Sequence, residues 1–526
     1  MKKTLLMLVA FMATMTAFAS AEEEGWQRSF APVADKADLA GMCTAVAADG
    51  SVYASSTYDQ AFLFGGVNVT NPEGLLSSII LKYDKDGNEK WSVSLVGKCY
   101  VRAMAADTDG TLYVAAQSQD EKVVCTGTDG KPYEIVNPTS DIYGYSYSAF
   151  LLRIDPNGAI AATKTISSEA NAELLTSMMY FPEKGDIYVN PIALRIAGDY
   201  LYVSANFTGD VQALGWYGSV LNIWDLMYQD NMSKGIFSCG KSDLAALQSE
   251  ACVQNAEAIS YNQYFPEAIE FVVAEGKVFF SFIGFGNLAV KTPAGEGKYS
   301  FEMATDESGN AEHALVMLRN DHPADGKVFH AAMHDKLRRP YNLVGGTMIG
   351  EKFYVSGTFY GNFPLDNSKY SVEKGVDPET SIMSYGNSSF VACIDGERNV
   401  AWSWVNPAES EATCMVVTGE EIHAATDAAM YTFKTATGEL DSDVMPVGFE
   451  DASCYNDQYV STIFTDGAGM VYVFCPKMKP SGIAAVKAAA NSANAKFYNL
   501  NGMELTGAQK GLNIVKTENG TFKVVK

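Results

Sequence analysis

The sequence predicts an all-β fold built from one repeated unit, and two observations support that prediction. A short phrase recurs seven times in the 526 residues: a few apolar residues, a tight turn, and a strand that usually contains an aromatic residue. Apolar and polar residues alternate with the period of two that strands require, and Gly, Asp or Asn marks the turns. A single hairpin cannot bury its apolar face, so such a unit recurs where neighbouring copies stack. The seven copies are centred on Tyr53, Tyr113, Tyr202, Phe280, Tyr354, His423 and Tyr472.

A second phrase follows the first after a loop of variable length. It is another strand pair around a Gly, Asn or Asp turn, and its clearest copies are 78–93, 149–158, 314–320, 390–404 and 430–438. The third copy is the faintest, and residues 243–247 are its best match. Two hairpins per repeat predict a four-stranded blade. Seven blades predict a closed seven-bladed β-propeller over residues 22–478.

An N-terminal strand is expected to close this ring. The phrase around Tyr472 is not followed by an outer hairpin, whereas Gly25–Phe30 reads like the strands that contain Trp91 and Trp402. Pairing an N-terminal strand into the last blade removes an exposed sheet edge. We therefore expect the strand around Trp26 to join the blade around Tyr472.

The sequence between the repeated motifs resembles secreted bacterial propeller repeats of the SBBP kind. Phe359–Phe363 reads Phe-Tyr-Gly-Asn-Phe, and Phe390–Asp395 matches the Phe-Val-X-X-Ile-Asp strand that comes later in such repeats. The turn and strand over residues 83–91 also fit. The resemblance extends over residues 26–478 and implies a fold, with no particular reaction.

The first 21 residues have the three parts of a secretory signal. Lys2 and Lys3 are followed by an apolar run over residues 5–18 and by small residues at 19–21. We expect the mature chain to begin at Glu22. The apolar run is shorter than the roughly 20 residues that a membrane span needs, and acidic residues follow it, so we expect no transmembrane span.

The charge of the chain argues against nucleic-acid partners. Without Lys2 and Lys3, the 38 Lys and Arg residues fall to 36 against 62 Asp and Glu, which gives a formal charge of −26. Such a surface repels phosphate backbones and anionic membranes. The sequence also lacks a P-loop, a nucleophile elbow and a dinucleotide fingerprint. We expect a monomer without a cofactor.

The C-terminal segment differs in composition from the repeats. Residues 479–495 resemble a linker, and residues 496–526 contain new strand text that resembles the sorting tail of the type IX (Por) secretion pathway. That resemblance implies delivery to the outer cell surface by the type IX machinery. The alternative is a small β module that packs on the propeller and exports nothing, with a periplasmic location. The residues that carry the resemblance are Tyr498, Asn499, Leu500, Gly502, Gly511, Ile514 and Val515.

Nine cysteines are present, and their spacing does not suggest zinc. Several lie in apolar strand contexts, where a thiol behaves as a small buried hydrophobe. Free buried thiols are therefore expected, including Cys393, Cys414 and Cys475. A bridge between Cys239 and Cys252 is the most plausible exception.

Two motifs raise the question of a metal site. His330 and His334 adjoin Asp335, but on a strand their spacing places the two side chains about 13 Å apart, too far to share an ion. The turns at 84–88 and 107–110 resemble the start of a calcium loop. Asp-Gly pairs also favour tight hairpin turns, and the remaining EF-hand ligands are missing. We expect outer-strand residues and structural turns, with no metal.

Two aromatic-rich loops are the candidate binding surface. Insertions in a propeller tend to gather on one face, and flat rings beside carboxylates suit sugar rings or extended peptides. The alternative is that these rings anchor long loops. The candidate residues are Tyr143, Tyr145, Tyr147, Trp216, Tyr217, Trp224 and Tyr228.

These features predict a secreted or cell-surface protein that binds a glycan or protein without catalysis. One alternative is an envelope enzyme of the lyase, lactonase or glycosidase type, with acids at the central mouth. Its candidate acids are Asp49, Asp107, Glu270 and Asp466. An acid, His and Arg cluster at the mouth would favour the enzyme, and small apolar residues would favour the binding protein. A further alternative is a structural surface component without a ligand.

Overall fold

The computed structural model describes parts of the chain between residues 26 and 525. The chain divides into a large unit, Gly25–Asn456 with Val460–Cys475, and a small one that includes Pro476–Lys526. The described residues are 26–30, 41–71, 74–137, 148–169, 189–207, 210–211, 233–255, 267–274, 276–284, 287–301, 310–335, 341–363, 365, 371–376, 383–385, 387–397, 399–418, 420–427, 429–440, 452–454, 460–465, 471–475, 496–498, 504–505, 512–517 and 520–525.

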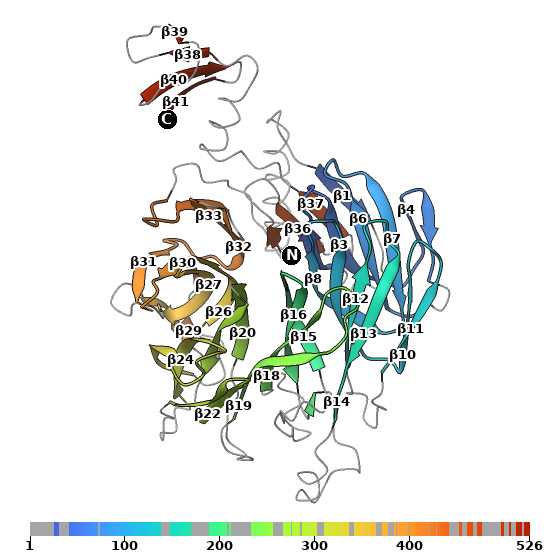
Figure 1. The fold of residues 1–526 in the computed structure, drawn as a ribbon, viewed down its shortest axis with the longest axis horizontal. Helices are drawn as coiled ribbons and strands as arrows, with labels where there is room; N and C mark the ends of the chain where they lie inside the picture. The colour runs from blue at the N-terminus through green and yellow to red at the C-terminus, as the bar shows by residue number, and fades with distance from the viewer. Residues whose placement is uncertain are drawn as a thin grey trace, which may run out of the picture. The chain divides into compact units, whose positions relative to one another are not determined.

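The described part of the large unit is all-β, and its strands form seven main antiparallel sheets (Figure 1). The first strands of these sheets are β2 (Gly41–Val46), β8 (Cys99–Ala106), β15 (Val189–Ala197), β20 (Glu267–Ala274), β26 (Tyr341–Ile349), β32 (Ala412–Thr418) and β35 (Ala452–Cys454). The second strands are β3 (Val52–Tyr58), β9 (Leu112–Ser118), β16 (Tyr200–Phe207), β21 (Lys277–Gly284), β27 (Lys352–Asn362), β33 (Glu421–Thr426) and β36 (Val460–Thr465).

The outer half of each sheet follows the same order. The third strands are β6 (Ser77–Tyr83), β12 (Ser148–Ile154), β18 (Ser233–Gly240), β24 (Asn310–Arg319), β30 (Asn387–Ile394), β34 (Met430–Lys434) and β37 (Val471–Cys475). The fourth strands are β7 (Glu89–Val96), β13 (Ile160–Ile166), β19 (Gln248–Asn255), β25 (Lys327–Asp335), β31 (Val400–Val405) and β1 (Trp26–Phe30). In the sixth sheet the described residues show only an isolated bridge, Phe433 to Leu440, beside β34.

The first strands bring the sheets together. β2 packs against β8, β8 against β15, β15 against β20, β20 against β26, β26 against β32, β32 against β35, and β35 against β2. Strands within a sheet, such as β3, β6 and β9, are buried at every residue because neighbouring sheets cover both of their faces. The arrangement is propeller-like.

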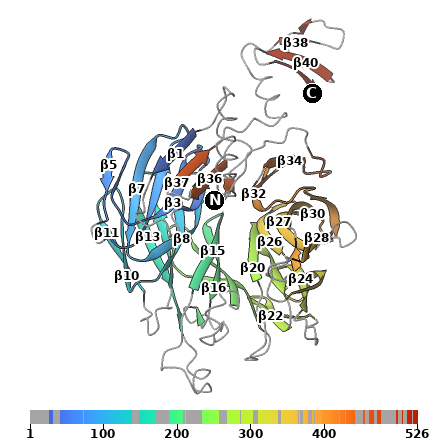
Figure 2. The same ribbon diagram turned by 180° about the vertical axis from the view of Figure 1, so that it is seen from behind.

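The predicted pairing of the N-terminal strand is confirmed (Figure 2). β1 pairs with β37 in antiparallel register, with Trp26 opposite Cys475 and Ser29 opposite Tyr472. The prediction that the phrase around Tyr472 is the innermost hairpin is wrong. The sheet is ordered β1-β37-β36-β35, so that hairpin supplies the two middle strands and β35 lies inside it.

The third sheet has the same four main strands as the first two, and the predicted position of its outer phrase is confirmed. β18 and β19 form the outer pair, and residues 243–247 lie in the turn between them. The turn uses Leu244 and Ala246 at positive φ (57° and 51°), where the matching turns of the first two sheets use Gly87 and Gly158. Because the usual Gly signal is missing, the turn is hard to recognise in the sequence.

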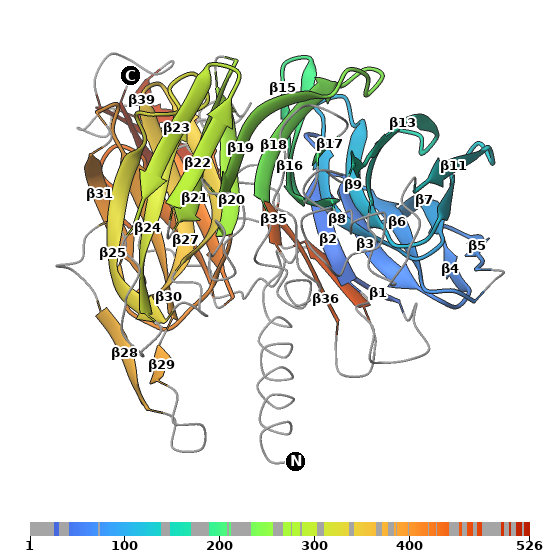
Figure 3. The same ribbon diagram turned by 90° about the horizontal axis from the view of Figure 1, so that it is seen from below.

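Two inserted hairpins pair with the sheet that precedes their own (Figure 3). The hairpin β10 (Lys122–Thr126) and β11 (Pro132–Val136) leaves the second sheet and pairs with β7 of the first. In the same way, β22 (Asn287–Thr292) and β23 (Gly295–Ser300) leave the fourth sheet and pair with β19 of the third. Each hairpin covers an edge that would otherwise be exposed.

The remaining insertions form small hairpins. β4 (Phe62–Phe64) pairs with β5 (Val67–Val69), and β28 (Ser371–Val376) continues from β27 and pairs with β29 (Met383–Tyr385). β14 (Ser168–Glu169) pairs with β17 (Asp210–Val211).

The small unit contains a four-stranded antiparallel sheet in the order β39-β38-β40-β41. Its strands are β38 (Lys496–Tyr498), β39 (Glu504–Leu505), β40 (Leu512–Thr517) and β41 (Gly520–Val525). Of the predicted sorting residues, Tyr498 pairs with Ile514, and Val515 pairs with Phe497. The others, Asn499, Leu500, Gly502 and Gly511, lie outside the described residues. The described part of the chain contains no helix of the length and hydropathy that a bilayer crossing requires.

Candidate functional site

The predicted aromatic binding loops are not among the described residues. Tyr143, Tyr145 and Tyr147 fall between β11 and β12, and Trp216, Tyr217, Trp224 and Tyr228 fall between β17 and β18. Several aromatic residues of the repeats have described side chains that contact the neighbouring sheet.

The tyrosines of the second strands reach the next sheet. The hydroxyl of Tyr53 donates to the carbonyl of Gly110 at 2.8 Å, and that of Tyr113 donates to the carbonyl of Lys241 at 3.1 Å. Burial raises the pKa of Tyr53 above its usual range, so the hydroxyl stays a donor. These tyrosines are therefore structural in role.

The tryptophans of the fourth strands repeat this pattern. The indole N–H of Trp91 donates to the carbonyl of Pro156 at 3.0 Å, and that of Trp26 donates to the carbonyl of Lys85 at 3.1 Å. Each ring lies against a glycine of the same turn. Gly158, at φ +90°, has no room for a Cβ beside Trp91. The repeat thus encodes contacts between sheets.

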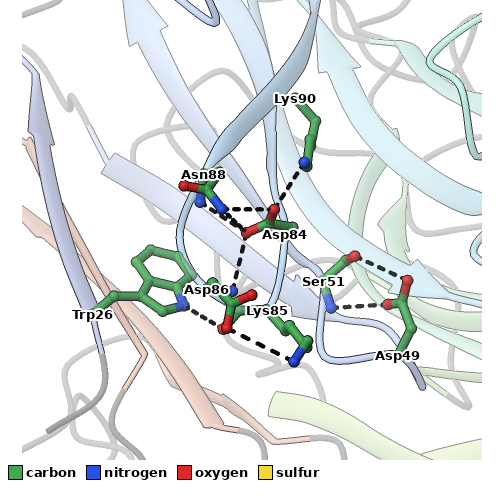
Figure 4. A network of polar contacts seen from close by, with 8 residues as sticks. All are labelled: Trp26, Asp49, Ser51, Asp84, Lys85, Asp86, Asn88 and Lys90. Atoms are coloured by element: carbon green, nitrogen blue, oxygen red, sulfur yellow. Dashed lines mark hydrogen bonds and ion pairs between the residues drawn. The ribbon is translucent and has the colours of Figure 1, made fainter.

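The turn at 84–88 is held by its own carboxylate (Figure 4). Asp84 Oδ1 accepts from the backbone N–H of Asp86 at 3.0 Å and of Asn88 at 2.8 Å, and Lys90 lies 2.8 Å from Oδ2. Burial would raise the pKa of Asp84, but the bonds from Lys90 and Asn88 outweigh it and hold that pKa well below the usual range. Both oxygens of the Asp84 carboxylate are used in these contacts, so the carboxylate stabilises the turn.

The described side chains form no group of three or more His, Cys, Asp or Glu residues suited to a metal ion. His330, His334 and Asp335 lie in β25, which is a strand as expected. Their side chains are outside the described part of the structure.

A central cavity is the site that the described residues form. Its volume is about 430 Å³, and six of the seven first strands line it. Most lining side chains are aliphatic or absent, and the polar ones are Arg195, Thr347 and Thr413. The other lining residues are Ala45, Val46, Met104, Ala105, Ala106, Leu194, Ile196, Val272, Val273, Val344, Gly345, Gly346, Cys414, Met415, Val416 and Val417.

A β-bulge in each of these six strands shapes the cavity. The pairing with the second strand shifts by one residue at the same place in every copy. A bulge leaves one residue unpaired and bends the strand. The unpaired residues are Met42, Arg102, Ile192, Ala268, Val344 and Thr413, and two of them, Val344 and Thr413, line the cavity.

Arg195 is the charged residue of the cavity lining. Its Nη2 donates to Glu270 Oε1 at 2.5 Å, and its Nη1 donates to the carbonyl of Leu194 at 2.9 Å. The guanidinium also lies 5.7 Å from the ring centre of Phe271. Glu270 is buried, while the Arg195 side chain is 36% exposed. The pair joins the third sheet to the fourth and neutralises the charge.

The acids proposed for an enzyme do not converge. Asp49 accepts from the backbone N–H of Ser51 in its own turn, and Asp107 forms an ion pair with Lys241 at 2.9 Å. Glu270 pairs with Arg195, and Asp466 lies outside the described residues. The sequence reasoning missed Arg195, although it is the one charged residue among those paired with the repeat aromatic. These paired residues are Ala45, Ala105, Arg195, Phe271, Thr347 and Val416.

The predicted bridge between Cys239 and Cys252 is wrong, because both are free. Cys252 is opposite Gly235, four residues from Cys239 on β18. That offset is about 13 Å along a strand, and a disulfide needs its Cα atoms within about 7 Å. The expectation of a free thiol is wrong for Cys414, which lines the cavity and is disulfide-bonded. Free buried thiols are confirmed for Cys99, Cys125, Cys393 and Cys475.

Comparisons with known proteins do not assign a family. No family model matches the sequence, and no curated protein does. Three of the solved structures to which the chain is similar, all at low TM-scores, serve as examples. They are a protein of unknown function from Bacteroides caccae (9% identity, 73% of this chain, 92% of that chain, TM-score 0.26), the AfRom2 CNH domain (8%, 72%, 94%, 0.28) and the WD40 domain of SCAP from fission yeast (9%, 86%, 98%, 0.34). Scores this low carry no argument about function.

Proposed function

We propose that this protein is a secreted or cell-surface β-propeller of seven blades that binds a glycan or a protein ligand and catalyses no reaction. The signal at residues 1–21 and the tail at 496–526 support export, with the type IX machinery as the route to the outer surface. If the tail is not an export signal, we expect the protein to stay in the periplasm.

Closure into one ring is supported by contacts around β1. The strand pairs with β37 in the seventh sheet, while its side chains reach the first sheet. The rings of Trp26 and Tyr83 lie 5.2 Å apart, and those of Phe30 and Phe62 stack at 5.5 Å. The insertion that contains Phe62 therefore packs against the N-terminal strand and holds that strand to the first sheet.

The proposal of binding rests on the three described candidate acids, Asp49, Asp107 and Glu270, each of which makes a structural contact. General acid–base catalysis needs two titratable groups that converge in a concave site. The side chains that line the cavity are mostly aliphatic, and they include Thr347, Thr413 and one arginine that is already paired. Such a lining suits a scaffold that presents its loops to a ligand.

A glycan array tests this proposal. Full-length protein is compared with the double variant Trp216→Ala, Trp224→Ala and with Tyr200→Ala, which removes an exposed ring from β16. We expect specific glycan binding that the double variant loses and that Tyr200→Ala keeps. Turnover of an arrayed glycan would contradict the non-catalytic part. If none of the three proteins binds a glycan, the hypothesis of a glycan ligand is rejected. A protein ligand is then the hypothesis to test.

A further inference from the structure

We propose that the central cavity is a second binding site, which takes one uncharged monosaccharide. The inference goes beyond the loop surface proposed above and does not depend on it, because it uses only the first strands of six sheets. Two features of these strands support it: the polar groups that they expose, and the ion pair between Arg195 and Glu270.

The polar surface of the cavity comes from the edges of strands. Most of the surface that the lining residues expose is polar, although most of their side chains are aliphatic. The lining contains runs of consecutive residues, 104–106, 194–196, 344–347 and 413–417. Successive side chains of a strand point to opposite faces, so a run of this kind lies along the edge of its strand. The backbone therefore supplies much of the polar surface.

These edges offer both kinds of hydrogen-bonding group. Among the described residues, each of the six first strands pairs with one other strand, the second strand of its own sheet. An edge strand directs a row of N–H and C=O groups away from its partner strand. Donors and acceptors therefore both face the cavity. A ligand whose groups donate and accept matches this lining, and a hydroxyl does both.

Arg195 adds a stronger contact at one point of the lining. A guanidinium has five N–H donors, and the bonds to the carbonyl of Leu194 and to Glu270 use two of them. The side chain is partly exposed and lines the cavity. The remaining N–H groups can therefore donate to a hydroxyl oxygen of the ligand, and a hydrogen bond to a charged group is stronger than one between neutral groups.

The charge of the lining selects an uncharged sugar. Glu270 already balances Arg195, and the described residues that line the cavity include no Asp or Glu. A carboxylate would lie near Glu270 in a chain of formal charge −24, without a second cation to pair it. An ammonium group would meet the Arg195 guanidinium. Either charge would lose hydration and gain no counter-charge.

The volume of the cavity limits the size of the ligand. Pockets for small molecules have volumes of roughly 300–1,000 Å³. The cavity, at about 430 Å³, is near the lower end of this range. Its size therefore suits one sugar ring with a few waters better than an oligosaccharide.

Isothermal titration calorimetry on the full chain tests the site. The neutral probes are glucose, galactose and mannose, and each is compared with its uronate and its 2-amino sugar, which keep the ring and add one charge. We expect at least one neutral hexose to bind once per chain, with a dissociation constant of about 1 mM or lower. Its affinity should be at least about tenfold higher than that of either charged counterpart. Binding of no neutral hexose, or equal binding of the charged counterparts, would overturn the proposal.

Hydrogen exchange with and without the bound hexose locates the site. We expect slower exchange of the amides within residues 194–196 and 344–347 when the sugar binds, because its hydroxyls accept from the edges of these strands. Pro132–Val136 of β11 is the matched control, since β11 also lies at the end of a sheet but does not line the cavity. Its exchange should not change. Binding that leaves both cavity segments unchanged would contradict a site at this place.

Two double variants separate the cavity from the loops. Arg195→Met, Glu270→Gln removes the ion pair without leaving a buried charge, and should weaken hexose binding at least about tenfold, the change expected for a lost hydrogen bond to a charged group. Trp216→Ala, Trp224→Ala alters only the loop surface and should leave this affinity unchanged, although it should lose binding on the glycan array. Unchanged affinity in the first variant, or lost affinity in the second, would contradict a sugar site in the cavity.

Discussion

The contact between Trp91 and Gly158 gives a prediction whose size follows from the structure. Gly158 has φ +90°, and a Cβ placed on it would lie 2.7 Å from Thr128 Cγ2 and 2.9 Å from Trp91 Cδ2. A left-handed conformation costs a residue with a Cβ about 1–2 kcal/mol. Forcing an extra carbon into a packed site adds about 1–3 kcal/mol. Gly158→Ala should therefore lower the free energy of unfolding by about 2–5 kcal/mol.

Gly130 is the matched control. It has φ +70°, but nothing lies within 4 Å of a Cβ placed on it. Gly130→Ala should therefore cost only the backbone part, about 1–2 kcal/mol. Urea denaturation followed by circular dichroism compares the variants, provided that the slope with urea is unchanged. Equal losses in Gly158→Ala and Gly130→Ala would refute the idea that the Trp91 ring rests on this glycine.

Three further predictions concern charge and thiols. Arg195→Met should lower the melting temperature, because it leaves the buried carboxylate of Glu270 unpaired at a cost of about 3–5 kcal/mol; adding Glu270→Gln should restore most of the loss, and no recovery would contradict the pairing. Burial alone would raise the pKa of Asp321, but hydrogen bonds from Arg319 and Lys277 outweigh this effect and lower the pKa to about 2. Its contribution to stability is therefore present above the unfolded pKa of 3.8 and is lost as the pH falls through about 2; acid unfolding of Asp321→Asn should be less steep in this range, and an unchanged acid transition would refute it. Burial raises the pKa of Cys99 to about 12 and that of Cys125 well above the usual range; both thiols should resist Ellman's reagent until the protein is denatured, and fast labelling of either in the native protein would count against this burial.

Local patterns explain what could be predicted from the sequence. The alternation around Tyr53 and Tyr113, with a Gly in each turn, defines the first and second strands wherever it occurs. Trp26 could be assigned to the last sheet because its strand resembles those of Trp91 and Trp402, and the three indoles make equivalent hydrogen bonds. Because the same contact between sheets recurs, the residue that makes it recurs in the sequence.

Non-local pairing explains what could not be predicted. The hairpin at residues 122–136 pairs with β7 of the preceding sheet, and nothing in the sequence of the hairpin identifies that partner. The bulges depend on the register between two strands, which one strand does not reveal. The cavity, in turn, depends on which side chains of six separate strands face one another. Arg195 could have been recognised from the sequence, since it is the one charged residue at this position in the six repeats.

Closure of the seven sheets by the N-terminal strand underlies the proposed scaffold, and hydrogen exchange of the intact protein tests it most directly. Mass spectrometry would compare the amides of Trp26–Phe30 with those of Val471–Cys475, the strand they pair with. Paired amides in a common cooperative unit exchange slowly together. We predict that both segments are protected to a similar extent. Exchange of Trp26–Phe30 at the rate of an unstructured chain, beside a protected Val471–Cys475, would contradict closure.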